Sequence, residues 1–130
     1  MSRENFNSIL IQDIMTKAMI TVNPTTTAKQ IAKMMEQGGI GAIFVKENEI
    51  PIGIVTDRDF ATRIAANGLT LDTPAEKIMS SPLITINHNE RLSAAAERMT
   101  SKKIRKLAVT ENGKIVGIIT STDLVTYLAK

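Results

Sequence analysis

The spacing of apolar residues along the first part of the chain predicts a strand followed by a helix. Residues 19–22 form a short apolar run that ends at Asn23-Pro24, which is typical of a short strand. The next apolar positions are spaced i, i+3, i+4 and i+7, as on one face of a helix. They are Ala28, Ile31, Ala32 and Met35. We expect a helix with one apolar stripe, capped by Thr25 or Thr26.

A hairpin and a second helix should follow. The apolar runs 42–46 and 50–56 stand on either side of the polar segment 47–49, which predicts a β-hairpin. Pro51 cannot donate a hydrogen bond to a neighbouring strand, so we expect it at a sheet edge or a strand start. The second helix is indicated by the apolar residues Phe60, Ala61, Ile64 and Ala65. The predicted order is β-α-β-β-α.

The chain contains this order twice. At a shift of 64 residues, positions 14–60 align with positions 78–124 without a gap, and 15 of the 47 aligned pairs are identical. The identical pairs include Ile14/Ile78, Met15/Met79, Ile20/Ile84, Thr21/Thr85, Met35/Met99, Gly53/Gly117, Thr56/Thr120 and Asp59/Asp123. Each copy has too little core to be stable alone, so we expect the two to pack about a pseudo-twofold axis.

The second copy carries matching signals. Residues 83–86 predict a short strand, and residues 106–110 and 114–120 predict a hairpin whose Asn112-Gly113 pair suits a tight turn. Its two helices are indicated by Leu92, Ala95, Ala96 and Met99, with Asn89 as the cap, and by Leu124, Val125, Leu128 and Ala129. The predicted fold class is α/β (α+β), with two β-α-β-β-α repeats whose small sheets are flanked by helices.

The domain boundaries follow from the repeat. Residues 14–66 form the first repeat and residues 78–130 the second. Residues 1–13 are expected to pack onto the module, because Ile9, Leu10 and Ile11 are apolar. Residues 67–77 form a linker with a short helix, which Pro74 should begin.

Composition limits the chemistry open to this chain. There is no Cys and a single His, which excludes disulfides and thiolate nucleophiles and leaves too few imidazoles for a typical zinc site. No nucleophile or base accompanies the aspartates, so we expect no catalytic residue, no metal and no cofactor. His88 is expected to be an exposed loop residue. The longest uncharged stretch, residues 78–89, is too short and polar to cross a bilayer, which makes the cytoplasm the expected location.

Charge is unevenly distributed. The net charge is +3 and the isoelectric point about 9.3; residues 1–66 are balanced, so the excess lies in residues 67–130. The densest basic cluster is Lys102, Lys103, Arg105 and Lys106. This cluster can hold the phosphate of a nucleotide or a nucleic acid, or it can be a solvated helix end.

A Thr-x-x-Asp motif stands at the last strand-to-helix junction of each copy, at Thr56–Asp59 and at Thr120–Asp123. A hydroxyl and backbone N–H groups at a helix N-terminus suit phosphate or ribose oxygens, and the carboxylate can accept from two vicinal ribose hydroxyls. The same spacing is close to that of a capping box, which needs no ligand. Both roles can coexist.

The two junction segments, residues 53–59 (Gly-Ile-Val-Thr-Asp-Arg-Asp) and 117–123 (Gly-Ile-Ile-Thr-Ser-Thr-Asp), resemble those of the cystathionine beta-synthase (CBS) domain pair, or Bateman module. The resemblance covers nearly the whole chain, because each copy also opens with Ile-Met-Thr or Ile-Met-Ser and residues 104–109 look like the family's second strand. It implies adenosyl ligands in clefts between the copies and a regulatory role. Stand-alone pairs of this family usually form dimers.

The resemblance also implies which residues line the clefts. Backbone groups for the adenine edge would come from Ile20, Thr21 and Ala42 in the first copy and from Ile84, Thr85 and Leu107 in the second, although each position also suits a plain core strand. The copy-opening hydroxyls Thr16 and Ser80 would complete the lining.

Phosphate contacts should distinguish the two sites. The second copy has Arg105 and Lys106 where related pairs hold phosphate, whereas the first has Gly41 and Ala42. In the family, a side chain at the position of Arg58 can reach the other copy's site. The counterpart of Arg58 in the second copy, Thr122, is neutral. We therefore expect the Asp123 site to bind phosphorylated adenosine more tightly than the Asp59 site.

The sequence predicts a non-catalytic module that senses AMP, ADP or ATP, with S-adenosylmethionine ranked below, and passes the signal to an unidentified regulated protein. A homodimer is expected through the apolar residues Ala61, Ile64, Ala65, Val125 and Leu128. One alternative is a nucleic-acid-binding module that uses residues 102–106, which the 3% aromatic content disfavours. The other is a purely structural dimerisation module. No contact with a membrane is expected.

Overall fold

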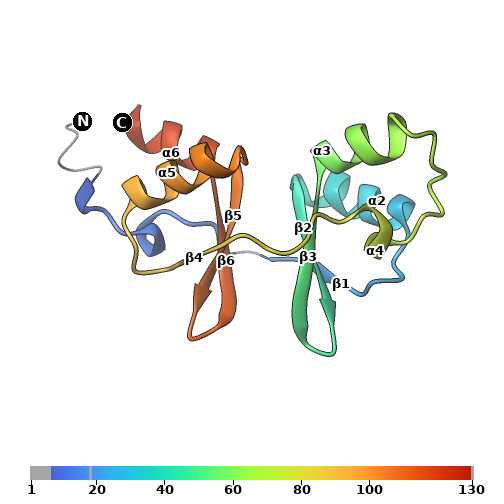
Figure 1. The fold of residues 1–130 in the computed structure, drawn as a ribbon, viewed down its shortest axis with the longest axis horizontal. Helices are drawn as coiled ribbons and strands as arrows, with labels where there is room; N and C mark the ends of the chain where they lie inside the picture. Colours follow the sequence, from blue (N-terminus) through green and yellow to red (C-terminus); the bar gives the residue numbers. More distant parts are fainter. Residues whose placement is uncertain (1–6, 18, 130) are drawn as a thin grey trace. The chain divides into compact units, whose positions relative to one another are not determined.

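The computed structural model describes residues 7–17 and 19–129, and Figure 1 shows the predicted β-α-β-β-α order twice. The first repeat consists of β1 (Thr21–Val22), α2 (Ala28–Gly38), β2 (Ala42–Glu47), β3 (Ile50–Thr56) and a last helix that begins as α3 (Asp57–Asp59) and continues as the π-helical segment η2 (Phe60–Ala65). The second consists of β4 (Thr85–Asn87), α5 (Leu92–Lys102), β5 (Lys106–Glu111), β6 (Lys114–Thr120) and α6 (Ser121–Leu128). Two short helices, η1 (Ile11–Asp13) and α4 (Ala75–Ile78), precede the repeats. The predicted fold class is confirmed.

Each repeat has a three-stranded mixed sheet, in the order β1-β2-β3 or β4-β5-β6. The first two strands of each sheet are parallel and the last two form the predicted hairpin. Pro51 lies in the edge strand β3 opposite Lys46, where the register shifts after Val45. A proline is tolerated there because an edge strand leaves one row of N–H groups without ladder partners.

The two hairpin turns have similar positive φ angles, although their second residues differ. Asn112 and Gly113 have φ angles of 51° and 78°, the positive values of the tight turn predicted from this pair. In the first repeat, Asn48 and Glu49 have φ angles of 52° and 65°. Glu49 therefore adopts a left-handed conformation that its Cβ atom disfavours.

The chain divides into two compact units whose boundaries differ from those of the repeats. The first-repeat unit is Ile20–Leu83, and the second-repeat unit combines residues 84–129 with the described residues before 20. In the first-repeat unit, Ser80 and Ile54 exchange backbone hydrogen bonds of 2.8 and 3.1 Å; in the second-repeat unit, Thr16 and Ile118 exchange two of 2.9 Å. Each repeat's opening segment thus packs on the strand before the other repeat's Thr-x-x-Asp motif.

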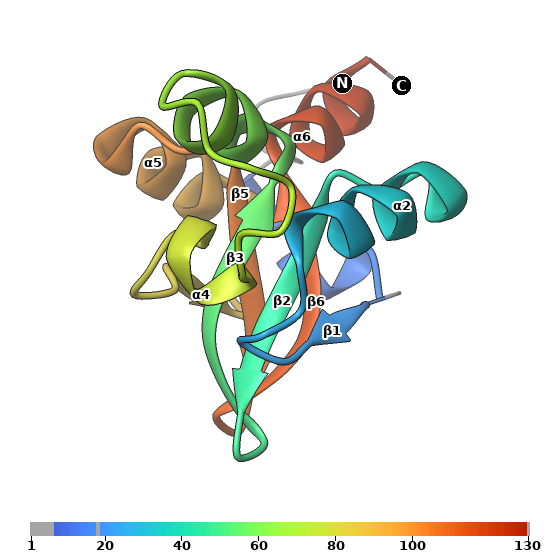
Figure 2. The ribbon, with the colours of Figure 1, turned by 90° about the vertical axis from the view of Figure 1, so that its right-hand side faces the viewer.

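The core of each unit lies between its sheet and its helices, which cover one face of the sheet in the first-repeat unit (Figure 2). Its fully buried residues come from α2, β2, β3 and α4 and include Ala28, Ile31, Ile43, Val45, Val55, Ala75 and Ile78. The second-repeat core likewise includes Ile86, Leu92, Ala95, Leu107, Val109 and Ile119, and it also includes Ile11 from η1. Residues 1–6 of the expected N-terminal packing segment, and residue 130 of the second repeat, lie outside the described residues.

The predicted helix caps are wrong. The α2 helix is capped by Thr27, whose side chain accepts a 3.2 Å hydrogen bond from the Gln30 N–H group. Thr25 and Thr26 do not cap it because both hydroxyls donate to Asn23 in the preceding turn. In the second repeat, Arg91 occupies the cap position without a side-chain bond, and Asn89 lies in the turn before it.

The structure also corrects the expected apolar surface of the last helices. Ile64 is 7% exposed and belongs to the core of the first-repeat unit, so it offers no surface to a second chain. Val125 and Leu128, one turn apart on α6, are 65% and 48% exposed. None of the helices described is long and apolar enough to span a membrane.

Candidate functional site

The Thr120–Asp123 motif forms a reciprocal capping box at the start of α6. The Thr120 N–H group donates to Asp123 Oδ2 over 2.8 Å, and the Asp123 N–H group donates to Thr120 Oγ1 over 3.2 Å. The capping interpretation therefore applies, and the Thr120 hydroxyl and Asp123 N–H group are engaged. Asp123 is half-buried, and among the described residues no partner bonds to its Oδ1 atom. This oxygen can therefore accept a further hydrogen bond.

Two basic residues lie at the same end of this sheet. Lys106 pairs with Thr120 across the β5–β6 ladder. The Arg105 carbonyl oxygen accepts a 2.8 Å hydrogen bond from the Ser121 N–H group, which fixes the backbone of Arg105 beside the first turn of α6. Arg105 itself is exposed. The structure therefore places the backbones of Arg105 and Lys106 beside Thr120 and the first turn of α6.

Most of the residues expected to contact the adenine edge in the second repeat already use their backbone or side-chain atoms within their own unit. The Ile84 carbonyl oxygen accepts from the Ala108 N–H group over 3.2 Å. The side chain of Leu107 is fully buried in the core, so that residue can offer a ligand backbone atoms alone. Thr85 is exposed, but its carbonyl oxygen accepts a 3.0 Å hydrogen bond from Arg98 Nη1.

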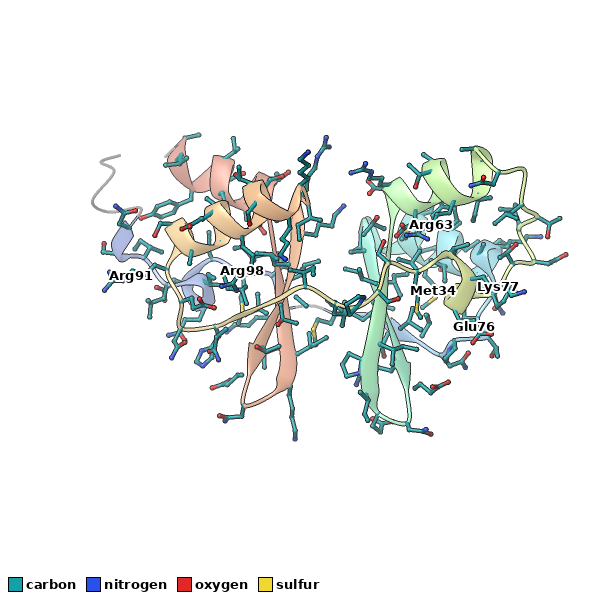
Figure 3. All side chains as sticks on the ribbon, in the orientation of Figure 1. Met34, Arg63, Glu76, Lys77, Arg91 and Arg98 are labelled. Atoms are coloured by element: carbon teal, nitrogen blue, oxygen red, sulfur yellow. The ribbon has the colours of Figure 1, made fainter. Side chains whose placement is uncertain are left out.

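Arg98 was not singled out in the sequence. It extends from α5 (Figure 3) and pairs with Glu90 over 3.3 Å while it donates to Thr85. Its counterpart in the first repeat is Met34, which cannot make either contact. Nothing in the local pattern signals this pair, because Glu90 lies in a turn eight residues before Arg98.

The Thr56–Asp59 motif in the first repeat has a different environment. Asp59 is 3% exposed and accepts from the Thr56 N–H group over 2.8 Å, as in the other motif. It also accepts from Arg63 Nε over 3.1 Å and from Ser80 Oγ over 3.0 Å. Arg63 extends from η2 (Figure 3). The four-residue spacing of Asp59 and Arg63 on a helix was the signal that could have revealed this pair.

The charge beside the first motif is also different. Ala42 pairs with Thr56 as Lys106 does with Thr120, and the Gly41 carbonyl oxygen accepts from the Asp57 N–H group. The carboxylate of Asp57 lies near Gly41, where an added Cβ atom would be 3.5 Å from Oδ2. The junction in the first repeat therefore carries the negative charge of Asp57, whereas the junction in the second repeat carries the positive charges of Arg105 and Lys106.

The other predicted site residues belong to one unit or the other. In the first-repeat unit, the Ile20 carbonyl oxygen accepts from the Phe44 N–H group over 3.0 Å, and Thr21 is exposed. Arg58 and Thr122 are exposed in the first turns of their helices, and the reach of Arg58 toward the other motif stays a prediction.

The two copy-opening hydroxyls lie in opposite units. Ser80 is beside Asp59 in the first-repeat unit, whereas Thr16 pairs with Ile118 near the second motif.

His88 lies in the turn after β4, but it is half-buried and not exposed as the sequence suggested. Its Nδ1 atom contacts Gln12 Oε1 and its Nε2 atom lies 3.7 Å from Glu111 Oε1. These residues line an open depression of about 440 Å³ in the second-repeat unit, together with Asp13, Met15, Lys17 and Val116. No predicted ligand-binding residue lines it.

Comparisons with known proteins match both repeats to one family. The sequence model of the CBS domain matches twice, over residues 11–66 and 75–130. The CBS domain-containing protein YhcV of Bacillus subtilis is 37% identical over 114 residues, which cover 88% of this chain and 81% of YhcV. An uncharacterized protein of Methanopyrus kandleri is also 37% identical, and the chain spans 61% of its length.

Solved structures share the fold. An uncharacterized conserved protein from Pyrococcus horikoshii superposes with a TM-score of 0.90 at 31% identity and covers 95% of both chains. The CBS domain pair of protein MJ0100 has a TM-score of 0.83 at 27% identity, over 93% of this chain and 96% of that one. That pair was solved in complex with 5′-methylthioadenosine and S-adenosyl-L-methionine.

Proposed function

The chain belongs to the CBS-domain family as a tandem pair, and on that premise we propose that it is a non-catalytic regulatory module that binds an adenine nucleotide, AMP, ADP or ATP, at the Thr120–Asp123 motif. The observation that carries the proposal is the Oδ1 atom of Asp123, which has no partner among the described residues. This oxygen stands at a junction with two basic residues.

Ribose recognition follows from the carboxylate. A ribose presents two vicinal hydroxyls that donate hydrogen bonds, and hydrogen bonds to a charged acceptor contribute about 1.5–3 kcal/mol. Asp123 Oδ2 is already oriented by the Thr120 N–H group. The capping box thus fixes the carboxylate before a ligand arrives, which lowers the entropic cost of binding.

Phosphate recognition follows from Arg105 and Lys106. Charge-assisted hydrogen bonds from Arg to phosphate are among the stronger polar contacts that proteins make. A phosphorylated adenosine gains these contacts and adenosine does not. This difference favours AMP, ADP or ATP over the uncharged adenosyl group, whereas MJ0100 was solved with 5′-methylthioadenosine and S-adenosyl-L-methionine.

The output of such a module requires a partner. A ligand that binds one conformation better shifts the population toward it, and the partner reads that shift. We propose a homodimer that uses the exposed apolar residues of α6, Val125 and Leu128. A regulated protein then responds to the occupancy of the motif.

A thermal-shift panel tests the proposal. AMP, ADP, ATP, S-adenosylmethionine, 5′-methylthioadenosine and GMP are added separately to the full chain and to the Asp123→Asn variant. A nucleotide at about 100 times its Kd should stabilise the wild-type fold by about 2.7 kcal/mol, with AMP, ADP or ATP leading and GMP without effect. If all six compounds leave the midpoint unchanged, or GMP matches the adenine nucleotides, the proposed function is wrong.

A further inference from the structure

The carboxylate of Asp59 is saturated by its own chain. Oδ2 accepts from the Thr56 N–H group over 2.8 Å and from Thr56 Oγ1 over 3.2 Å. Oδ1 accepts from Arg63 Nε over 3.1 Å and from Ser80 Oγ over 3.0 Å. The residue is 3% exposed. Water therefore contributes little to holding this charge, and the four protein donors hold it instead.

Of these four donors, the equivalent carboxylate in the second repeat keeps the backbone N–H group of the motif threonine among the described residues, and two of the three missing donors lie at positions where the copies differ. Arg63 corresponds to Tyr127, which packs against the core and carries no cation. Ser80 corresponds to Thr16, whose side chain is exposed. Asp123 consequently keeps Oδ1 without a partner among the described residues and is half-buried where Asp59 is buried.

The Ser80 contact joins parts of the chain that are far apart in sequence. Ser80 lies 21 residues after Asp59, in the segment that follows α4. Its backbone exchanges hydrogen bonds with Ile54 in β3, while its hydroxyl donates to Asp59 at the start of the last helix. Asp59 thus connects the segment after α4 to η2 through Ser80 and Arg63.

A ribose at Asp59 would have to displace these donors. Its two hydroxyls need carboxylate lone pairs that Arg63 and Ser80 already occupy, and breaking a buried charged hydrogen bond leaves groups that must find other partners. At Asp123 the ribose finds one oxygen available. The two motifs share Thr and Asp at the same spacing, yet the Asp59 carboxylate is occupied by donors of its own chain, whereas the Asp123 carboxylate can accept from a ligand.

We infer that Asp59 has a structural role: its hydrogen bonds with Ser80 and Arg63 link the segment after α4 to the first repeat's last helix, and we call this link the joint. We also infer that each chain binds a single adenine nucleotide, at Asp123. The second part of this inference rests on the proposed function. The first part does not, so the two are tested by separate measurements.

The joint is tested by unfolding in urea without any ligand. Ser80→Ala should lower the unfolding midpoint, whereas Thr16→Ala, the matched change at the equivalent position, should leave it unchanged. Ser80→Ala combined with Asp59→Ala should cost less than the sum of the two single changes, because both remove the hydrogen bond between Ser80 Oγ and Asp59 Oδ1. Strict additivity, or equal effects of Ser80→Ala and Thr16→Ala, would overturn the joint.

The single site is tested by titration calorimetry with AMP and with ATP. The wild-type chain should bind one molecule, Asp59→Asn should keep both affinity and stoichiometry, and Asp123→Asn should weaken binding about tenfold or more. Two molecules per chain, or loss of binding in Asp59→Asn with retention in Asp123→Asn, would overturn the single site. If the wild type binds neither nucleotide, the proposed function and the single site are both wrong. The joint is then decided by the unfolding measurements alone.

Discussion

Gly117 in β6 lies so close to Thr16 that a Cβ atom on the glycine would be 2.7 Å from the Thr16 carbonyl oxygen. The same contact recurs in the other unit, where a Cβ atom on Gly53 would be 2.6 Å from Met79 Sδ and 3.0 Å from the Ser80 carbonyl oxygen. In both units a glycine makes room for the segment that opens the other repeat.

We expect Gly117→Ala to destabilise the protein by about 1–3 kcal/mol, as overpacking typically does. The obstacle is the backbone carbonyl of Thr16, a residue whose position is fixed by two backbone hydrogen bonds exchanged with Ile118. Gly53→Ala should cost less, because its backbone obstacle, the Ser80 carbonyl oxygen, would be 3.0 Å away and the nearer Met79 side chain can adjust its conformation. Urea unfolding measures both changes.

Gly38→Ala is the matched control. A Cβ atom there would meet neighbours at 3.5 Å or more, which is ordinary contact, and the residue lies in α2. Alanine favours a helix over glycine, so this variant should be as stable as the wild type or more stable. Equal losses in Gly117→Ala and Gly38→Ala would contradict the steric explanation.

A second prediction concerns Glu49, which has a φ angle of 65° in the turn of the first hairpin. The left-handed conformation costs a non-glycine residue about 1–2 kcal/mol, part of which is offset by the greater freedom of glycine in the unfolded chain. Glu49→Gly should therefore raise the free energy of unfolding by about 0.5–1 kcal/mol. The converse change, Gly113→Glu, should lower it by a similar amount. The two results should have opposite signs in thermal or urea unfolding, and a loss in both variants would refute the idea.

A third prediction addresses assembly. Sedimentation equilibrium at micromolar concentration should show a homodimer for the wild type and a monomer for Val125→Asp or Leu128→Asp, because a charge at an apolar interface is costly to bury. Ile50→Asp is the control, since Ile50 is 63% exposed but lies beside the hairpin turn. A wild-type chain that remains a monomer, or a dimer that survives both α6 changes, excludes this interface.

Local chemistry made much of the fold predictable. The spacing of apolar residues determined the type and order of the elements, and Asn112-Gly113 determined a turn with two positive φ angles. The duplication located the two Thr-x-x-Asp motifs at equivalent junctions, because both follow a strand of the same register. These features depend on neighbours within a few residues.

Contacts between distant residues were not predictable in the same way. Asp59 and Asp123 are identical in the alignment of the repeats, but Ser80 and Arg63 surround only the first. The association of Thr16 with Ile118, and of Ser80 with Ile54, pairs each opening segment with the other repeat's strand, which no local pattern encodes. Ile64 was misjudged because a helical stripe does not reveal which face the core will cover.

We propose that Asp123 and Arg105 together recognise a phosphorylated adenosine. Arg105 should supply phosphate contacts and Asp123 ribose contacts, so the two substitutions should affect different ligands. Lys103→Ala is a suitable control, since Lys103 is an exposed basic residue at the end of α5.

The decisive measurement is titration calorimetry of AMP and adenosine with four proteins: the wild type, Arg105→Ala, Asp123→Asn and Lys103→Ala. Arg105→Ala should weaken AMP about tenfold or more while adenosine changes little, since one charged hydrogen bond to phosphate is worth about 1.5–3 kcal/mol. Asp123→Asn should weaken both ligands, and Lys103→Ala neither. If Arg105→Ala weakens AMP and adenosine equally, or Asp123→Asn leaves AMP affinity intact, the assignment of this site is wrong.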